Sequence, residues 1–320
     1  MTAHPGAISR TAAEIATQPA CWRRSAELAA HLGDAFPATG ERVAVVGCGT
    51  SWFIAQSCAA LRETSGAGET DAWPASGFPV GRRYDRVVLI SRSGTTTEVL
   101  ELAAALRGSA VLTGVSADGS APLAAAVDHA VVLDHADEQS VVQTRFATSA
   151  LALFRAALGE SLDAAVADAE RALAGELPAA AVTAEQHTFL GTGWTYGLAQ
   201  EAALKLREAA GAWTEAYPAM EYRHGPISVT GPGRAVWVFG GLPVGLEEEI
   251  GATGGALVAG SDPHRSAGRG TALSGGEPLD PMADLVRAQR LAVAVALEAG
   301  LDPDTPRHLT RSVILGEGGR

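Results

Sequence analysis

Hydrophobic positions along the chain fall into short continuous runs that alternate with longer segments at helical spacing. Runs that are apolar at every position are typical of strands buried on both faces of a parallel sheet. Such strands are predicted at residues 43–46, 87–90, 109–116 and 129–135, and again at 187–193, 234–241 and 255–261. Because helical patterns separate them, the sequence predicts an α/β protein with parallel sheets.

Helices are predicted where apolar residues recur every three or four positions. Two are expected within residues 8–35, separated near Pro19, and others at 145–157, within 162–186 and at 280–299. The Gly-, Ser- and Pro-rich segment 262–279 is predicted to be a loop.

The second half of the chain repeats the first in outline, since each half has a strand, a glycine turn, a helix and further strands. Two comparable β-α-β units indicate a duplicated α/β domain. The expected domains are residues 1–165, with the N-terminal helices, and residues 166–320, with the C-terminal segment. Ligands are expected at the carboxyl ends of the strands, where loops of parallel sheets gather.

Composition narrows the classes of protein. Of the 320 residues, 47% are hydrophobic and 19% charged, which favours a folded chain with a large core over a disordered one. The net charge of −12 and the lack of a local Lys/Arg cluster argue against nucleic-acid binding. No signal sequence and no run of eighteen apolar residues is seen, so we expect no membrane span and no export.

Three cysteines, Cys21, Cys48 and Cys58, have spacings that fit neither a zinc site nor a disulfide framework. We interpret them as reduced thiols of a cytoplasmic protein. No cluster of ligands predicts a metal, and no cofactor is expected: GCGTSW lacks the third glycine of a dinucleotide fingerprint, and no P-loop lysine follows.

Two hydroxyl-rich turns stand where a strand precedes a helix, at residues 48–51 (CGTS) and 91–96 (SRSGTT). Backbone N–H groups, helix dipoles and hydroxyls would converge there on an anion such as a phosphate. The alternative is that Ser and Thr act only as helix caps and turn formers. Two such turns in adjacent β-α units favour halves of one phosphate site.

A stripe of ionisable side chains follows the glycine turn of the second half. Glu201, Lys205 and Glu208 stand at i, i+4 and i+7 of a predicted helix, and His224 follows on a loop. An acid, an amine and an imidazole in one short segment can move protons on a small polar substrate. The alternative is a solvated helix side with a weak salt bridge.

Five motifs resemble, in order, those of a known family. VVGCGTSWFIA, LISRSGTTTEVLEL and EQSVVQTRFAT resemble the segments of a sugar isomerase (SIS) domain. The stretch 191–228 and the motif PRHLTRSV resemble the second SIS domain in the isomerase part of glucosamine-6-phosphate synthase and in its deaminase and deglycase relatives. The resemblance covers about residues 35–315.

This resemblance implies two flavodoxin-like, three-layer α/β/α SIS domains, each with a five-stranded parallel sheet. It also implies a homodimer with shared active sites, in which a histidine comes from the partner chain. The implied substrate-binding residues are Gly49, Thr50, Ser51, Ser91, Arg92, Ser93, Thr96, Glu201 and Arg311. The implied catalytic residues are Glu208, which moves a proton between C1 and C2, His224, which opens the sugar ring, and Lys205 beside the substrate.

Two departures from the synthase shape the predicted function. No glutamine-hydrolysing domain is present, so we expect no ammonia from glutamine. Arg311 stands where the synthase has an imine-forming lysine, and a protonated guanidinium does not form imines. We therefore predict a phosphosugar isomerase that deaminates or deglycates a 6-phosphorylated amino sugar or ketosamine. The alternatives are a simple aldose–ketose isomerase and a non-catalytic phosphosugar sensor.

Overall fold

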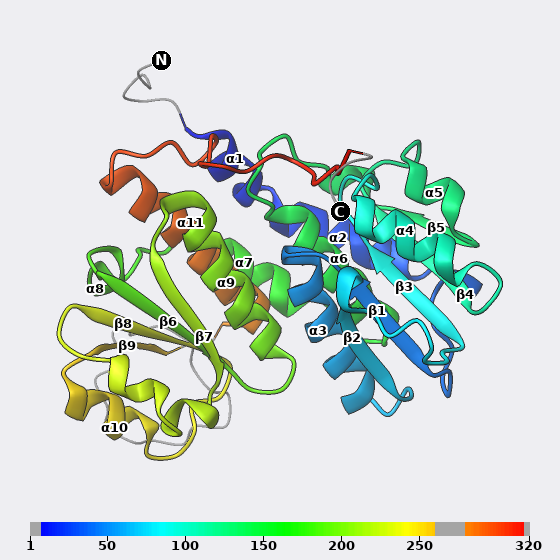
Figure 1. Ribbon diagram of the computed structural model, residues 1–320. Coiled ribbons are helices and arrows are strands. Elements are labelled where there is room, and N and C mark those ends of the chain that lie inside the picture. Colours follow the sequence, from blue (N-terminus) through cyan, green and yellow to red (C-terminus); the bar gives the residue numbers. More distant parts are fainter. Residues whose placement is uncertain (1–7, 260–278, 317–320) are drawn as a thin grey trace. The chain divides into compact units, whose positions relative to one another are not determined.

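The computed structural model describes residues 8–259 and 279–316, and the chain divides into two compact units (Figure 1). The N-terminal unit consists of residues 20–162 together with 310–316, and the C-terminal unit of residues 163–309 together with 8–19. These units differ from the expected domains, residues 1–165 and 166–320, at both ends of the chain. The first helix packs in the C-terminal unit, and the C-terminal segment packs in the N-terminal unit.

The N-terminal unit contains a five-stranded parallel sheet in the order β2-β1-β3-β4-β5. Its strands are β1 (Val43–Gly47), β2 (Thr70–Pro74), β3 (Arg86–Ile90), β4 (Val111–Ser116) and β5 (His129–Val132). This is the doubly wound, flavodoxin-like order that the resemblance implied.

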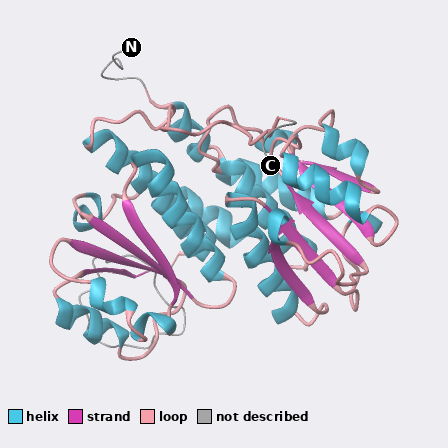
Figure 2. Ribbon diagram, in the orientation of Figure 1, coloured by secondary structure: helices cyan, strands magenta, loops and turns pink. Residues whose placement is uncertain are grey.

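Helices cover both faces of this sheet (Figure 2). They are α2 (Gln18–Ala29), α3 (Thr50–Thr64), α4 (Thr97–Leu106), α5 (Pro122–Ala126) and α6 (Arg145–Ala157), with the short 3-10 turns η1 (Gly33–Ala35), η2 (Ala75–Gly77) and η3 (Asp134–Ala136). Helix α3 packs on β1 and β2 and against α6, whereas α4 packs against α5. The expected three-layer α/β/α architecture is confirmed.

The C-terminal unit repeats the arrangement with four described strands in the order β7-β6-β8-β9, all parallel. They are β6 (Gln186–Gly191), β7 (Trp213–Pro218), β8 (Arg234–Phe239) and β9 (Ala256–Ala259). The five strands implied by the resemblance are thus four in the part of this unit that the structure describes. The loop predicted at 262–279 lies, up to residue 278, outside the described residues.

The helices of the C-terminal unit are α1 (Arg10–Ala16), α7 (Asp163–Ala174), α8 (Ala179–Val182), α9 (Thr195–Ala210), α10 (Leu246–Thr253) and α11 (Pro281–Glu298), with η4 (Glu221–Arg223) and η5 (Pro226–Val229). The long helix α11 packs against α9, α7 and α1, and α10 packs on β9. Within the described ranges, no helix combines the length and the apolar character needed to cross a bilayer.

Strands β2 and β7, each at one edge of its sheet, were missed, whereas β5 and β9 at the opposite edges of the described sheets were predicted together with the central strands. All residues of β1 and β3 are buried, and these strands read as almost continuous apolar runs. Strands β2 and β7 lie at the sheet edges, are only partly buried and end at Pro74 and Pro218. Their mixed composition hid them from a search for apolar runs.

A glycine brings strand and helix together at the same place in both units. A Cβ atom on Gly47 would lie 2.5 Å from the carbonyl carbon of Ser51, and one on Gly191 would lie closer still to the backbone of Thr195. Two residues later, Gly49 and Gly193 have φ of 52° and 58°, a conformation that favours glycine. These turns therefore have glycine for two separate steric reasons.

We expect Gly191→Ala to destabilise the C-terminal unit by about 2 kcal/mol or more, because the new methyl group meets backbone atoms that cannot move alone. Thermal or urea unfolding measures the loss. Gly251→Ala is the matched control, since a Cβ atom on Gly251 in α10 meets nothing within 4 Å and alanine favours a helix. Equal stability of the two variants would contradict the close approach.

Candidate functional site

The two hydroxyl-rich turns of the N-terminal unit meet at the switch point of its sheet. Strands β1 and β3 pair in parallel from Val43 and Arg86 to Val46 and Leu89, so their carboxyl ends lie side by side. Strand β2 pairs on the other side of β1, which makes the β1–β3 boundary the point where the winding reverses. Ligands of open α/β sheets bind at such points.

The hydroxyls in these turns do not cap the helices that follow. Helix α3 has Gly49 as its N-cap and α4 has Thr96, and neither start has a side-chain capping hydrogen bond. Instead, Ser91 Oγ and Thr96 Oγ1 lie 3.1 Å apart, and Ser51 and Ser91 are buried. The alternative of capping is therefore not supported for these two helices, whereas Ser93 does act as a turn former, because its Oγ accepts from the Thr95 N–H at 3.2 Å. The uncapped helix starts suit an anion.

The C-terminal segment runs along the second turn and takes part of its polar groups. Ser93 Oγ donates to Ser312 Oγ at 3.1 Å, and Thr95 Oγ1 lies 3.0 Å from the same atom. The Thr97 N–H donates to the carbonyl of Val313 at 3.3 Å. The Ser93 side chain thus has protein partners, whereas the predicted Ser91 and Thr96 hydroxyls turn toward each other.

Arg92 holds this segment in place. Its side chain is buried and donates to the carbonyl oxygens of Ser140 (3.0 Å) and Arg311 (2.6 Å). Its Nη1 also lies 3.8 Å from the carboxylate of Glu138, which is itself buried. Among the predicted binding residues, Arg92 therefore has a clear structural role, because it ties the backbone of residue 311 to the loop before α6.

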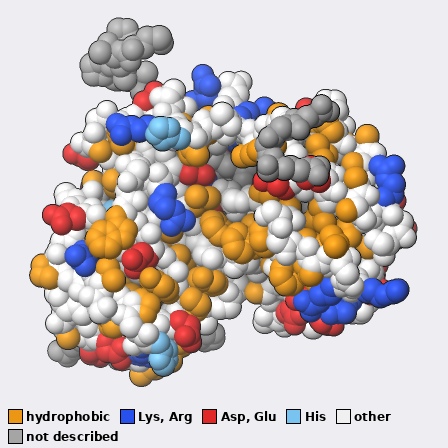
Figure 3. Space-filling model, in the orientation of Figure 1, with side chains coloured by type: hydrophobic (Ala, Val, Ile, Leu, Met, Phe, Trp, Pro, Cys, Tyr) orange, Lys and Arg blue, Asp and Glu red, His pale blue; other side chains and the backbone are white. Residues whose placement is uncertain are grey.

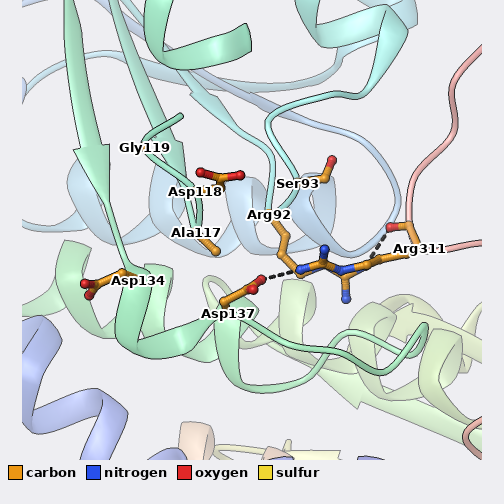
Figure 4. A pocket seen from close by; sticks show the side chains of 8 residues that line it. All are labelled: Arg92, Ser93, Ala117, Asp118, Gly119, Asp134, Asp137 and Arg311. Atoms are coloured by element: carbon orange, nitrogen blue, oxygen red, sulfur yellow. Dashed lines mark hydrogen bonds and ion pairs between the residues drawn. The ribbon is translucent and has the colours of Figure 1, made fainter. Parts of the chain in front are cut away.

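Beside this turn, a cavity of about 340 Å³ opens at the carboxyl ends of β4 and β5 (Figure 4). It is lined by Arg92, Ser93, Ala117, Asp118, Gly119, Asp134, Asp137 and Arg311. Figure 4 shows Asp137 turned toward the guanidinium of Arg311, with which it forms an ion pair. The three aspartates were missed in the sequence, although they lie at or just after the carboxyl ends of the predicted strands 109–116 and 129–135, where ligands were expected.

Two titratable groups near these turns have shifted pKa values. Hydrogen bonds from the hydroxyl and the backbone N–H of Ser120 lower the pKa of Asp118, so it remains a carboxylate. Burial raises the pKa of the Cys48 thiol to about 11, and the charge of Glu98 adds to the effect. A raised pKa disfavours the thiolate, which is the nucleophilic form of a cysteine.

The ionisable stripe of α9, in the C-terminal unit, is largely buried. Lys205 Nζ lies 3.6 Å from Glu201 Oε1 and pairs directly with Glu208. The side chains of Glu201 and Lys205 are 0% and 1% exposed, whereas that of Glu208 is 20% exposed. A solvated helix side with a weak salt bridge is thus excluded for the first two residues. Glu208 is the member of the stripe that a small molecule can reach.

Lys205 is also the single lysine of the chain, since all its other basic side chains are arginines. Every other Lys/Arg position of the chain has arginine, which carries the same positive charge. A positive charge alone therefore does not explain why position 205 has a lysine. A compact ammonium differs from a planar guanidinium in size, hydration and chemistry. This signal was present in the sequence and was missed.

His224 lies apart from the stripe on the same unit. It follows η4 directly, its side chain is exposed, and Gly225 after it has φ of 125°. Its neighbour Arg223 anchors the loop through Glu249 (Nε to Oε2, 2.8 Å) and the carbonyl of Val244. The structure therefore brings Glu201, Lys205 and Glu208 together and leaves His224 on an exposed loop.

Charged side chains on the face drawn in Figure 3 lie singly or next to charges of opposite sign.

Comparison with known proteins agrees with this fold and these motifs. The chain is 30% identical over 319 residues to the glutamine–fructose-6-phosphate aminotransferase (isomerizing) of Pseudomonas aeruginosa, covering 85% of this chain and 51% of that protein. A similar match, 30% over 304 residues with the same coverage, is found with the enzyme of that name from Methanothermobacter thermautotrophicus. The chain thus spans about half the length of these curated relatives. No protein-family model matched the chain.

Solved structures share the fold over nearly the whole chain. Glucosamine-6-phosphate deaminase from Thermotoga maritima has a TM-score of 0.78 at 24% identity, covering 96% of this chain and 100% of that one. Tagatose-6-phosphate ketose/aldose isomerase from Escherichia coli has a TM-score of 0.79 at 20% identity, covering 97% and 99%. The resemblance to double SIS-domain proteins and the fold class predicted from it are therefore confirmed.

Because the turn suits an anion, we expect Ser91→Ala to weaken the binding of inorganic phosphate about tenfold or more, since a hydrogen bond to the charged group would be lost. Isothermal titration calorimetry measures the change. Ser109→Ala is the matched control, since Ser109 bonds only the carbonyl of Leu106 at the far end of α4. Unchanged affinity in Ser91→Ala would remove the turn from phosphate binding.

Proposed function

We propose that this protein is a phosphosugar isomerase that deaminates or deglycates a 6-phosphorylated amino sugar or ketosamine. The observation that carries the proposal is the stripe on α9, in which a partly exposed glutamate is paired with a buried lysine. The similarity to a glucosamine-6-phosphate deaminase and to aminotransferases acting on fructose 6-phosphate supports it. A homodimer in the cytoplasm is part of the same proposal.

In this proposal the phosphate binds the turns of the N-terminal unit. The hydroxyls of Ser51, Ser91 and Thr96, with the N-termini of α3 and α4, supply donors for a dianion without a basic side chain. Holding the phosphate fixes the sugar, so that positioning contributes much of the rate acceleration. The close hydroxyls of Ser91, which is buried, and Thr96, which is partly buried, support this role.

Glu208 acts as the base that takes a proton from one of the two carbons C1 and C2 and returns it to the other. The charge that develops on the enediolate or enolamine is stabilised by the Lys205 ammonium, which also keeps the Glu208 carboxylate oriented. Glu201 holds Lys205 from the other side. His224, reaching in from the partner subunit on its exposed loop, assists ring opening.

We expect Glu208→Gln to lower turnover of glucosamine 6-phosphate by about 10²–10⁴-fold, the usual contribution of a general base, with little change in binding. Ammonia release and calorimetry measure the two quantities separately. Glu298→Gln at the exposed end of α11 is the control for loss of one carboxylate in this unit. Retained turnover in Glu208→Gln would exclude it as the base.

A simple aldose–ketose isomerase is the second candidate, favoured by the similarity to a tagatose-6-phosphate ketose/aldose isomerase. The same residues could carry out that reaction, so a panel of keto- and amino-sugar 6-phosphates separates the two. Formation of the isomerised sugar without release of ammonia or an amine would identify a simple aldose–ketose isomerase. Binding with no conversion of any sugar, followed by NMR, would instead identify a phosphosugar sensor.

We expect borohydride to trap no sugar adduct on Lys205 during turnover. Its buried Nζ is held between the carboxylates of Glu201 and Glu208, and Arg311 cannot form an imine. Because the chain has one lysine, peptide mass spectrometry locates any adduct without ambiguity. An adduct that disappears in Lys205→Arg would show imine catalysis and overturn this expectation; one that persists would lie on the N-terminal amine.

A further inference from the structure

The C-terminal segment 310–316 lies on the start of helix α4, which is one half of the proposed phosphate site. The carbonyl of Val313 accepts from the N–H of Thr97, the first residue of α4, at 3.3 Å, and the N–H of Leu315 donates to Thr97 Oγ1 at 2.9 Å. Because α4 has no side-chain cap, this carbonyl satisfies one of the N–H groups that a helix start leaves without a partner. The segment therefore occupies a donor that an anion would use.

The hydroxyl of Ser312 engages side chains of the same turn. Ser93 Oγ accepts from the N–H and the hydroxyl of Thr95, at 3.2 and 2.9 Å, and donates its own hydrogen to Ser312 Oγ at 3.1 Å. Thr95 Oγ1 also lies 3.0 Å from Ser312 Oγ. A hydroxyl has one hydrogen to donate, so Ser93 has none left for a ligand while Ser312 is in place. The docked segment thus uses Ser93, which the resemblance assigned to the substrate.

Polar contacts hold this segment in place, whereas its apolar side chains remain in solvent. The side chains of Val313, Ile314 and Leu315 are 48% to 69% exposed, so little apolar burial is lost when the segment leaves α4. The hydrogen bonds that it makes each contribute modestly to stability, because water replaces them on release. The buried Arg92 keeps the carbonyl of Arg311 anchored at 2.6 Å, so only residues 312–316 need to move.

We propose that residues 312–316 are an autoinhibitory segment that competes with an anionic ligand for the start of α4. In the docked state the carbonyl of Val313 and the hydroxyl of Ser312 take the place of phosphate oxygens, and bound phosphate displaces them. The inference rests on the anion-binding turn of the proposed function and adds a resting state in which part of that turn is occupied. The competition is reciprocal, because phosphate weakens docking by the same factor by which docking weakens phosphate binding.

The test measures the binding of inorganic phosphate to the full chain by calorimetry, in the wild type and in the double variant Ser312→Ala/Leu315→Pro. Alanine removes the hydroxyl that engages Ser93, and proline removes the N–H that donates to Thr97 Oγ1. We expect the double variant to bind phosphate about fivefold more tightly, the factor that corresponds to one hydrogen bond of ordinary strength. Ile314→Ala, which changes a mostly exposed side chain of the same segment, is the matched control and should bind phosphate as the wild type does.

Hydrogen–deuterium exchange gives a second readout on the unmodified chain. Saturating phosphate should speed exchange at the amide of Leu315, because this N–H loses its acceptor on Thr97 when the segment is displaced. A segment that closes over the ligand would instead be protected by phosphate.

Slower exchange at Leu315 on addition of phosphate, or equal or weaker phosphate binding in the double variant, would overturn the autoinhibition, as would the absence of phosphate binding in both forms. Turnover of 6-phosphorylated sugars is measured separately. Turnover without the gain in phosphate binding would refute the autoinhibitory segment and leave the proposed function standing. The gain in binding without turnover of any sugar would refute the proposed reaction and leave the role of the segment intact.

Discussion

The close approach of a strand end to the following helix is the constraint on which both units depend. At Gly47 and Gly191 a side chain would collide with the backbone four residues later, and this closeness aims the N-termini of α3 and α9 across the carboxyl edge of each sheet. Parallel strands then place the neighbouring turns at the same edge. This backbone geometry therefore sets where the turns and helix starts at the carboxyl edge of each sheet lie, whatever side chains they carry.

The two units share this strand–turn–helix geometry, but different polar side chains occupy its turns and helices. In the N-terminal unit the turns carry hydroxyls that leave the starts of α3 and α4 without a side-chain cap. In the C-terminal unit Thr195 Oγ1 donates to the carbonyl of Phe239 at 2.9 Å, so its hydroxyl joins two turns of the backbone. The cluster of titratable side chains in that unit lies on α9 instead, where the buried Lys205 pairs with Glu201 and Glu208. A buried charge of this kind is tolerated only because it is paired on both sides.

The C-terminal segment packs against the second turn of the N-terminal unit and takes up part of its polar groups. Arg92 and Ser93, which the motif of their turn would assign to the ligand, use their side chains to hold residues 311 and 312. Arg311 is thereby placed in the wall of an acidic cavity with Asp137. Arg311 and Asp137 thus form a charged wall of the cavity beside the turn at 91–96.

Local patterns in the sequence determined the α/β class, the central strands, the phosphate-type turns and the stripe at 201, 205 and 208, because each depends on residues close together in the chain. The edge strands β2 and β7 escaped, since half-exposed strands lack a continuous apolar run. Only the tertiary structure decided that the chain ends exchange units, that Glu201 and Lys205 are buried, and that Arg311 meets Asp137 across 174 positions. Such contacts depend on how distant segments pack, and no periodicity in the sequence records them.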